Sequence, residues 1–504
     1  MVDIKSFILM ILVLTSLSSA ATLSVNGTGA NCLVGTQTNY STIQAAVNAA
    51  TAGDTVRVCR NSTVGYNETL IVNKSLNIYG NESFVLVRAA NVSLPVFAVN
   101  ATYVNITNLT ITGATSSYGI RLNSTSGNAH IWEVNASGNN YGFFLDSSSN
   151  NNLTNNTANG SSNYGISVYT GSSNNTVAFN TVHNGSGSGI QVSQNQNNTF
   201  TSNSVYNMTT YSMFLSLSHN NTFTNNTFNN SWYGPLLQSS DENVLVSNTM
   251  AGNSLDGLQL QGSDNNNISS NTIFGNFQIG INVISGSQNN RIFSNSIYNH
   301  TNGTATGIIF TSINVVNHVY NNPIITNNTY GIYLNQSNFT NITNNTAYNN
   351  SINGFYFSAS SNNTITSNTA YNNSQNGFRL VSSSDNNTIL SNTASNNTLD
   401  GFSLNPSSSN NLSGNMANDN LRIGYLLIGN NNTINNNTAK NNILAGFVIQ
   451  ASTGNNLSLN NATNNSVQYQ LSSNANVTFT GINYALSTPS NGLDLNITGG
   501  SNGT

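Results

Sequence analysis

The sequence predicts an all-β fold, a parallel β-helix solenoid in which three short strands form each coil. Three observations predict it. One Asn recurs without a gap, from Asn156 to Asn460, over 304 residues in 13 steps of about 23 residues each. A Gly column runs beside it, and each repeat holds three short runs of alternating apolar and polar residues. Alternation at period two places successive side chains on opposite faces of a strand, so each run has one buried face.

The Asn column has a structural explanation. Asn tolerates the left-handed backbone of sharp turns, and its amide both donates and accepts, so identical Asn side chains stacked at strand spacing can bond along the column. The Gly column opens the following strand, where the corner needs backbone freedom, and it fails once, near Tyr211 and Ser212. The predicted ladder comprises Asn156, Asn180, Asn203, Asn226, Asn248, Asn271, Asn295, Asn322, Asn345, Asn368, Asn392, Asn415, Asn437 and Asn460.

The first twenty residues have the pattern of a secretory signal peptide. Lys5 precedes an apolar run from Phe7 to Leu14, and small residues lead to a cleavage site after Ala20 or Ala21. An uncleaved membrane anchor is the alternative, although the run is short for a membrane-spanning helix. The mature protein is therefore expected to be secreted, extracytoplasmic or on the cell surface, with a membrane contact only through this segment if it is retained.

The remaining chain divides into three parts. Residues 21–115 are expected to form an N-terminal cap and the first irregular coils, including a short helix that Ser41 or Thr42 caps and that covers the open end of the solenoid. Residues 116–470 are expected to form the regular coils, and residues 471–504 a C-terminal cap or tail.

Composition excludes several classes of function. Only 5% of the residues are charged and the formal net charge is −4, so no basic patch is expected to bind nucleic acid or an anionic membrane. In an exported protein, Cys32 and Cys59 are most simply one disulfide. Sequons number roughly forty, but a repeat built from NNT and NNS generates them automatically, so their density alone does not establish a glycoprotein.

The chain resembles a known family. The segments STIQAAVNAATAGDTVRV and NETLIVNKSLNIYG, followed by repeated NGF and NNTIxSNTAxNN coils, are similar to right-handed parallel β-helix proteins of the NosD type. This resemblance covers nearly the whole mature chain and implies a periplasmic copper-binding label, with many relatives at the bacterial or archaeal surface. Because the same coil also serves carbohydrate lyases, esterases and epimerases, the resemblance implies fold more than activity. The five histidines form no close ligand set by spacing, so no metal site is predicted.

Two polar groups are candidate catalytic sites. His219, Asp241 and Asp264 occupy one turn position on successive coils, continued by Gln288 and flanked by Glu242. Two carboxylates about 5 Å apart could share a proton, act as a retaining glycosidase pair or hold Ca²⁺, the one cofactor considered. A plain solvated turn is the alternative interpretation.

The second candidate is Arg291 and His318, which share one position on two successive coils. They lie beside an insertion, roughly His300 to Ala305, that is expected to form a protruding loop. A cation and an imidazole could bind a uronate carboxylate or act as a base. Two unconnected surface side chains are the alternative.

Aromatic residues form the candidate carbohydrate-binding surface. Flat aromatic rows suit sugar rings and protein partners, whereas cross-strand stacking that only stabilises the sheet is the alternative. One stripe follows the Asn ladder and a parallel stripe lies on another face. The first comprises Phe274, Tyr298, Ile325, Tyr348 and Tyr371, with His183 and Tyr206 earlier, and the second Tyr333, Tyr356 and Arg379.

Three functions are compatible with these features. The favoured one is an exported rod, non-catalytic, with a structural, adhesive or carbohydrate-binding role and with polysaccharide or envelope components as partners. Scarcity of ionisable groups favours it over the second, a polysaccharide lyase, hydrolase or epimerase. The third, a copper-handling protein, is implied only by the resemblance.

Overall fold

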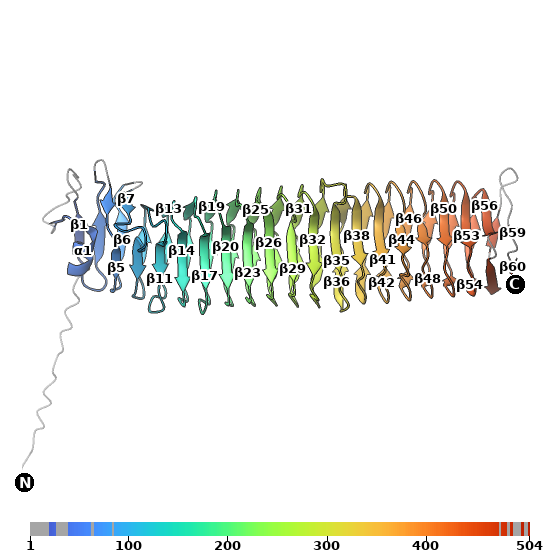
Figure 1. The fold of residues 1–504 in the computed structure, drawn as a ribbon, viewed down its shortest axis with the longest axis horizontal. Helices are drawn as coiled ribbons and strands as arrows, with labels where there is room; N and C mark the ends of the chain where they lie inside the picture. Colours follow the sequence, from blue (N-terminus) through green and yellow to red (C-terminus); the bar gives the residue numbers. More distant parts are fainter. Residues whose placement is uncertain are drawn as a thin grey trace, which may run out of the picture.

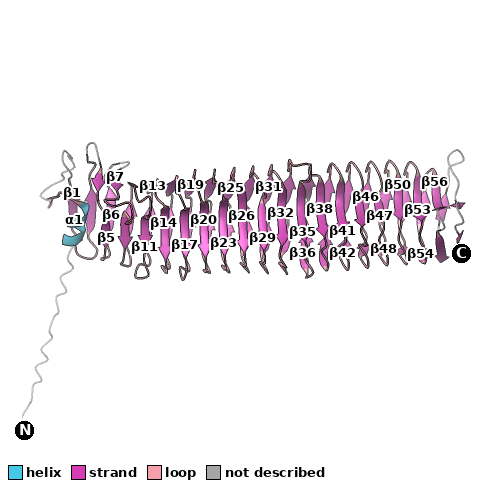
Figure 2. Cartoon of the chain, in the orientation of Figure 1, coloured by secondary structure: helices cyan, strands magenta, loops and turns pink. Residues whose placement is uncertain are grey.

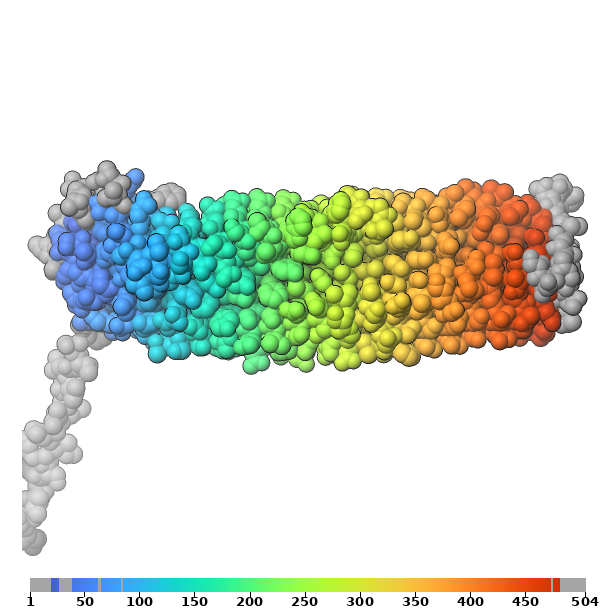
Figure 3. Space-filling model, in the orientation of Figure 1, coloured from blue at the N-terminus to red at the C-terminus, as the bar shows by residue number. Residues whose placement is uncertain are grey.

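The computed structural model describes residues 20–26, 39–61, 65–82, 85–472 and 475–480, together with the backbone of 484–486, 495–497 and 502–503. These residues form a long straight rod of stacked coils, with the N-terminal segments at one end and the C-terminal segments at the other (Figures 1 and 3). Cys32 lies outside the described residues, and so does the predicted signal peptide up to residue 19. Its cleavage and the disulfide therefore stay predictions. Cys59 is fully buried. No helix within the described residues has the length and apolar character to cross a membrane.

Three parallel sheets run along the rod, and each regular coil contributes one strand to each sheet, as predicted. Among the described residues, sheet A has 22 strands and sheets B and C have 19 each. One coil, for example, contains β42 (Thr364–Thr366) in sheet A, β43 (Thr369–Tyr371) in sheet B and β44 (Phe378–Val381) in sheet C. Figure 2 shows that strands make up nearly the whole rod.

The strands that position the candidate sites are grouped by sheet. Sheet A includes β30 (Asn267–Ser269), β33 (Arg291–Phe293), β36 (Asn317–Tyr320), β39 (Thr340–Thr343) and β48 (Asn411–Ser413). Sheet B includes β19 (Thr181–His183), β22 (Ser204–Tyr206), β31 (Thr272–Phe274), β34 (Ser296–Tyr298), β37 (Ile324–Thr326) and β40 (Thr346–Tyr348). Sheet C includes β11 (Tyr118–Leu122), β14 (Tyr141–Asp146), β17 (Tyr164–Tyr169), β38 (Tyr330–Asn335), β41 (Asn353–Ser358) and β47 (Phe402–Leu404).

The predicted helix covers the N-terminal end of the rod. Helix α1 (Ile43–Ala49) begins after Thr42, whose hydroxyl oxygen accepts a hydrogen bond from the Ala45 N–H at 3.2 Å. The carboxylate of Glu68 accepts from the N–H groups of Ile43 and Gln44, both at 2.8 Å, and so satisfies donors that the first turn leaves free. The buried face of helix α1 packs on the apolar core of the first coils.

The core is a column of stacked apolar side chains along the rod axis. On the inner face of sheet C, successive rings stack with centroids 4.5–5.1 Å apart and planes within 9° of parallel. This separation equals the spacing of neighbouring strands, because each ring packs on its equivalent in the next coil. The column comprises Phe355, Phe378, Phe402, Tyr425, Phe447 and Tyr469.

The predicted Asn ladder is confirmed. At each of its inner steps the side chain is buried, its Oδ1 accepts from the Asn of the preceding coil, and its Nδ2 donates to the Asn of the following coil, as Asn368 does between Asn345 and Asn392. Two further Asn ladders, which sequence analysis did not single out, run at the other corners. One includes Asn363 and Asn387 and the other includes Asn373 and Asn397.

Candidate functional site

Sheet C carries a compact group of tyrosines on its outer face, which we call the tyrosine cluster: Tyr330, Tyr333 and Tyr356. Register pairs Tyr333 with Tyr356, and Tyr356 with Arg379 in the next strand, so the predicted second stripe is contiguous in the structure. Tyr330 adds a third ring, 5.4 Å from Tyr333 and 5.0 Å from Tyr356 between centroids.

The Tyr333 ring is inclined to the other two rings of the tyrosine cluster, Tyr330 and Tyr356, which stack on each other at 14°. Tyr333 lies at 43° to Tyr330 and 44° to Tyr356, and all three side chains are half-buried. Burial raises the pKa of the Tyr330 and Tyr333 phenols above the usual value, so both hydroxyls stay protonated and can donate hydrogen bonds at neutral pH. The cluster therefore offers partly uncovered ring faces, hydroxyl donors and the adjacent guanidinium of Arg379.

The stripe predicted on sheet B is interrupted. It contains three separate pairs, each nearly parallel: His183 with Tyr206, Phe274 with Tyr298, and Tyr348 with Tyr371. Tyr348 and Tyr371 are 4.8 Å apart with planes only 3° from parallel. Rings stacked in this way cover each other's faces, which is the geometry expected of cross-strand stabilisation.

The assignment of Ile325 to this stripe is wrong. Ile325 is fully buried, and Thr326 occupies the outward position between Tyr298 and Tyr348. Pro323 follows Asn322 and has no N–H for the ladder, so the strand begins at Ile324, one residue later than in other coils. A shift of one residue exchanges the two faces of a strand.

Sequence reasoning missed Tyr330 and the residues that share its register. They stand directly before the Gly column and thus belong to the corner rather than to an alternating run. On β11, β14 and β17 of sheet C, Tyr118, Tyr141 and Tyr164 occupy this position. The rings of Tyr118 and Tyr141 contact Phe144, and Tyr164 contacts Tyr141. In the register of Tyr330, Asp400 is buried and accepts from Arg422, with 2.7 Å between Arg422 Nε and Asp400 Oδ1. Scanning the residue before each Gly would have found these groups.

The structure also brings the first candidate column together. His219 Nδ1 lies 3.5 Å from Asp241 Oδ2 and accepts from the Asp241 N–H at 3.1 Å. Asp241 Oδ1 accepts from the Asp264 N–H at 2.8 Å, and Asp264 accepts from the N–H and the side-chain amide of Gln288, both at 2.9 Å. Each carboxylate thus accepts from the backbone of the next coil.

Neutral side chains make the same bond elsewhere in this column. Asn338 Oδ1 accepts from the Ser361 N–H, and Ser361 Oγ accepts from the Asp385 N–H. At this position a side chain, charged or neutral, accepts a hydrogen bond from the backbone N–H of the equivalent turn in the next coil. This bonding gives Asp241 and Asp264 a structural role that needs no substrate.

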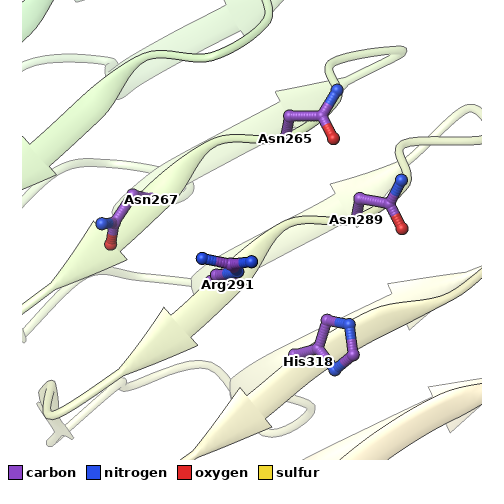
Figure 4. Close-up of a pocket in the computed structure, with 5 residues that line it drawn as sticks. All are labelled: Asn265, Asn267, Asn289, Arg291 and His318. Atoms are coloured by element: carbon purple, nitrogen blue, oxygen red, sulfur yellow. The ribbon is translucent and has the colours of Figure 1, made fainter.

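Arg291 and His318 are direct neighbours in register on β33 and β36. With Asn265, Asn267 and Asn289 they line a hollow of about 350 Å³ on the outer face of sheet A (Figure 4). The insertion His300 to Ala305 contributes nothing to this lining, because it lies between β34 and β35 (Thr306–Thr311), at the corner of sheets B and C. His300 itself is buried, and its Nδ1 accepts a hydrogen bond from the Asn276 N–H at 3.2 Å. It thus takes the place of an Asn in the third ladder, the one that includes Asn373 and Asn397.

The described histidines do not form a metal centre. They lie in different coils, and no three His, Cys, Asp or Glu side chains converge anywhere in the part of the chain that the structure describes. The donors present therefore do not fit a copper site of the usual imidazole and thiolate kind.

Comparison with known families matches two models. The model of the right-handed β-helix region matches residues 179–329, 300–394 and 331–484, and that of the periplasmic copper-binding protein NosD matches residues 47–232. Comparison with curated proteins finds no match.

Several solved structures are similar. ORF18 of Geobacillus virus E2 is 13% identical with a TM-score of 0.43, over 59% of this chain and 60% of that one. The catalytic domain of a GH87 α-1,3-glucanase is 14% identical with a TM-score of 0.39 over 60% and 64%. A GH136 lacto-N-biosidase from Eubacterium ramulus is 13% identical with a TM-score of 0.41 over 55% and 64%. The chain thus spans less than two thirds of each, and these likenesses concern the fold alone.

Proposed function

This chain belongs to the right-handed β-helix family, and on that premise we propose that it is an exported, non-catalytic rod that binds carbohydrate through the tyrosine cluster of sheet C. The observation that carries the proposal is the inclination of the Tyr333 ring to the stacked pair of Tyr330 and Tyr356, beside Arg379. Export is supported by the signal-peptide pattern of the first twenty residues and by the match to a family described as periplasmic.

The chemistry of the tyrosine cluster suits a sugar. The C–H face of a pyranose packs on an aromatic face, while its hydroxyls need hydrogen-bond donors and acceptors around that face. Tyr333 supplies a ring that is not covered by parallel stacking, the phenol hydroxyls supply donors, and Arg379 adds a cation on the next strand. The parallel pairs of sheet B offer mainly ring edges, so they are weaker candidates.

Two observations support a non-catalytic role. Asp241 and Asp264 already accept from the backbone of the following coil, as uncharged side chains do elsewhere in the same column. Charged residues are also scarce, whereas general acid–base catalysis needs ionisable groups positioned around one bond.

The test is retention of the purified mature protein on a polysaccharide panel, with and without Ca²⁺, with product release measured in parallel. The decisive variant is Tyr333→Ser/Tyr356→Ser. Its matched control is Tyr348→Ser/Tyr371→Ser, which removes two stacked tyrosines from sheet B, one in the coil of Tyr356 and one in the coil of Arg379. Each ring is worth about 0.5–1.5 kcal/mol beyond its buried area, so we expect the cluster variant to bind roughly tenfold or more weakly.

The outcomes separate the candidate functions. Retention that the cluster variant loses and the control keeps supports the proposal. Equal loss in both variants would contradict the role of sheet C. Product release that disappears in Asp241→Asn/Asp264→Asn, with the fold intact, would make the protein an enzyme and overturn its non-catalytic assignment.

A further inference from the structure

The hollow around Arg291 is a candidate binding site on a different face from the tyrosine cluster. Asn267, Arg291 and His318 stand on the three neighbouring strands β30, β33 and β36, and Asn265 and Asn289 lie at the turns before the first two (Figure 4). The lining is thus one guanidinium, one imidazole and three amides, with no carboxylate.

The positive charge of Arg291 is not neutralised within the described residues. The three ion pairs found there join Arg121 to Asp146, His219 to Asp241, and Arg422 to Asp400. Asp264, which directly precedes Asn265, already accepts two hydrogen bonds from Gln288. In a chain with only ten Lys and Arg, an exposed guanidinium in a carboxylate-free hollow favours an anionic ligand.

His318 is arranged to act as a donor to that ligand. Its Nδ1 lies 3.4 Å from the side-chain amide nitrogen of Asn341 on β39, which can only donate, so in the neutral ring the proton is on Nε2. The groups that face it from the neighbouring strands are Arg291 and Asn341. Burial, and then the charge of Arg291, lower the pKa of His318, so the ring is neutral at neutral pH.

We propose that this hollow binds a carboxylate-bearing sugar. The planar guanidinium of Arg291 pairs with both carboxylate oxygens, and His318 donates a further hydrogen bond. The amides of Asn265, Asn267 and Asn289 donate to and accept from the sugar hydroxyls. The site lies on sheet A and uses none of the tyrosines of sheet C, so it stands or falls independently of the proposed function.

A bound carboxylate changes the protonation of His318. It stabilises the imidazolium, and this raises the pKa of His318 in the complex above its value in the free protein. Binding therefore takes up a proton, and affinity rises as the pH falls from neutral toward the pKa of the free ring.

The experiment is a ligand-observed NMR titration of the full protein with glucuronate, acetate and glucose, at about pH 7.5 and 5.5, where a sugar carboxylate stays ionised. The variants are Arg291→Gln and His318→Asn; Asn is already found in this column at Asn267 and Asn341. Arg88→Gln, which removes an exposed guanidinium from β7 (Val85–Arg88) of sheet B, is the matched control. Circular dichroism checks the fold of each variant.

We expect glucuronate to bind more tightly than acetate and glucose to show no binding that depends on Arg291. Arg291→Gln should lose at least tenfold in affinity for glucuronate while Arg88→Gln loses none. His318→Asn should remove the gain in affinity at the lower pH. Glucuronate binding that is unchanged in Arg291→Gln, or glucose binding that Arg291→Gln weakens as strongly, would overturn the site. Equal affinity for acetate would overturn its assignment to a sugar, and a wild-type affinity that does not rise at lower pH would overturn the role of His318.

Discussion

Replacing one ladder residue, Asn368→Ala, should destabilise the rod far more than a surface substitution. The Asn368 side chain is 1% exposed and makes four hydrogen bonds. Its Oδ1 accepts from the N–H of Asn345 at 2.9 Å and from the Asn345 amide at 3.0 Å. Its Nδ2 donates to the Ile342 carbonyl at 2.8 Å and to Asn392 Oδ1 at 3.0 Å.

The magnitude follows from this count. Each lost bond costs about 1 kcal/mol net, so four cost about 4 kcal/mol, and the buried N–H of Asn345 loses its acceptor. The corner is closed by the coils above and below, so these partners lie away from bulk water. The expected loss in free energy of unfolding is therefore about 4 kcal/mol.

The assay combines urea unfolding, followed by circular dichroism, with native-state hydrogen exchange. Asn411→Ala is the control, because Asn411 is an exposed residue of β48 and its truncation should change stability by no more than about 0.5 kcal/mol. Since each coil of a solenoid contacts only its neighbours, protection should fall most in the coils of Asn345, Asn368 and Asn392. A loss within about 1 kcal/mol of the control would refute this explanation of the ladder.

Three further predictions concern buried ionisable groups. Burial raises the pKa of Asp256 to about 6, although Asn282 donates a hydrogen bond to it, so the free energy of unfolding falls as pH rises from about 4 to 6. Asp256→Asn should restore on the order of 3 kcal/mol at neutral pH, measured by urea unfolding across that pH range. Burial lowers the pKa of His300 to about 4, so the unfolded chain is protonated first and stability is lost as pH falls from about 6.5 to 4. His300→Asn should remove this loss of thermal stability at acid pH. A loss that is the same in the variant would contradict the buried neutral state of His300. Arg422→Gln leaves the carboxylate of Asp400 buried and should cost about 3 kcal/mol, which the second change Asp400→Asn should largely recover in the double variant.

Much of the architecture could be predicted from the sequence because the repeat states it at every coil. The recurring Asn fixes which residues stack, so the ladder, the three strands per coil and the adjacency of Tyr333, Tyr356 and Arg379 followed from alignment alone. In a parallel in-register stack, equivalent sequence positions are spatial neighbours.

The errors arise where the alignment hides an insertion. Pro323 adds one residue after the ladder, and the turn between Asn328 and Gly331 is one residue shorter than usual, so the spacing of the Gly column does not change. Ile325 was therefore assigned to the wrong face.

Other parts of the site depend on side-chain orientation, which a repeat does not specify. The column positions of Tyr333 and Tyr348 are equally regular in the sequence, but only the structure distinguishes rings that are inclined from rings stacked in parallel. The hydrogen bonds that Asp241 and Asp264 make to the next coil are likewise invisible in the sequence, because Asn and Ser fill the same position in other coils.

The amide bonds of the ladders all point one way, from each coil to its successor. Asn345 donates to Asn368, Asn368 donates to Asn392, and in the third ladder Gln468 ends the series by accepting from Asn465 at 2.9 Å. Along the ladder from Asn156 to Asn460, every inner coil thus presents the same donor to the following coil and the same acceptor to the preceding one. Duplication or loss of one whole repeat in the gene would leave each bond of this ladder with a partner. The length of such a rod can therefore change during evolution in steps of about 5 Å without redesigning this part of its core.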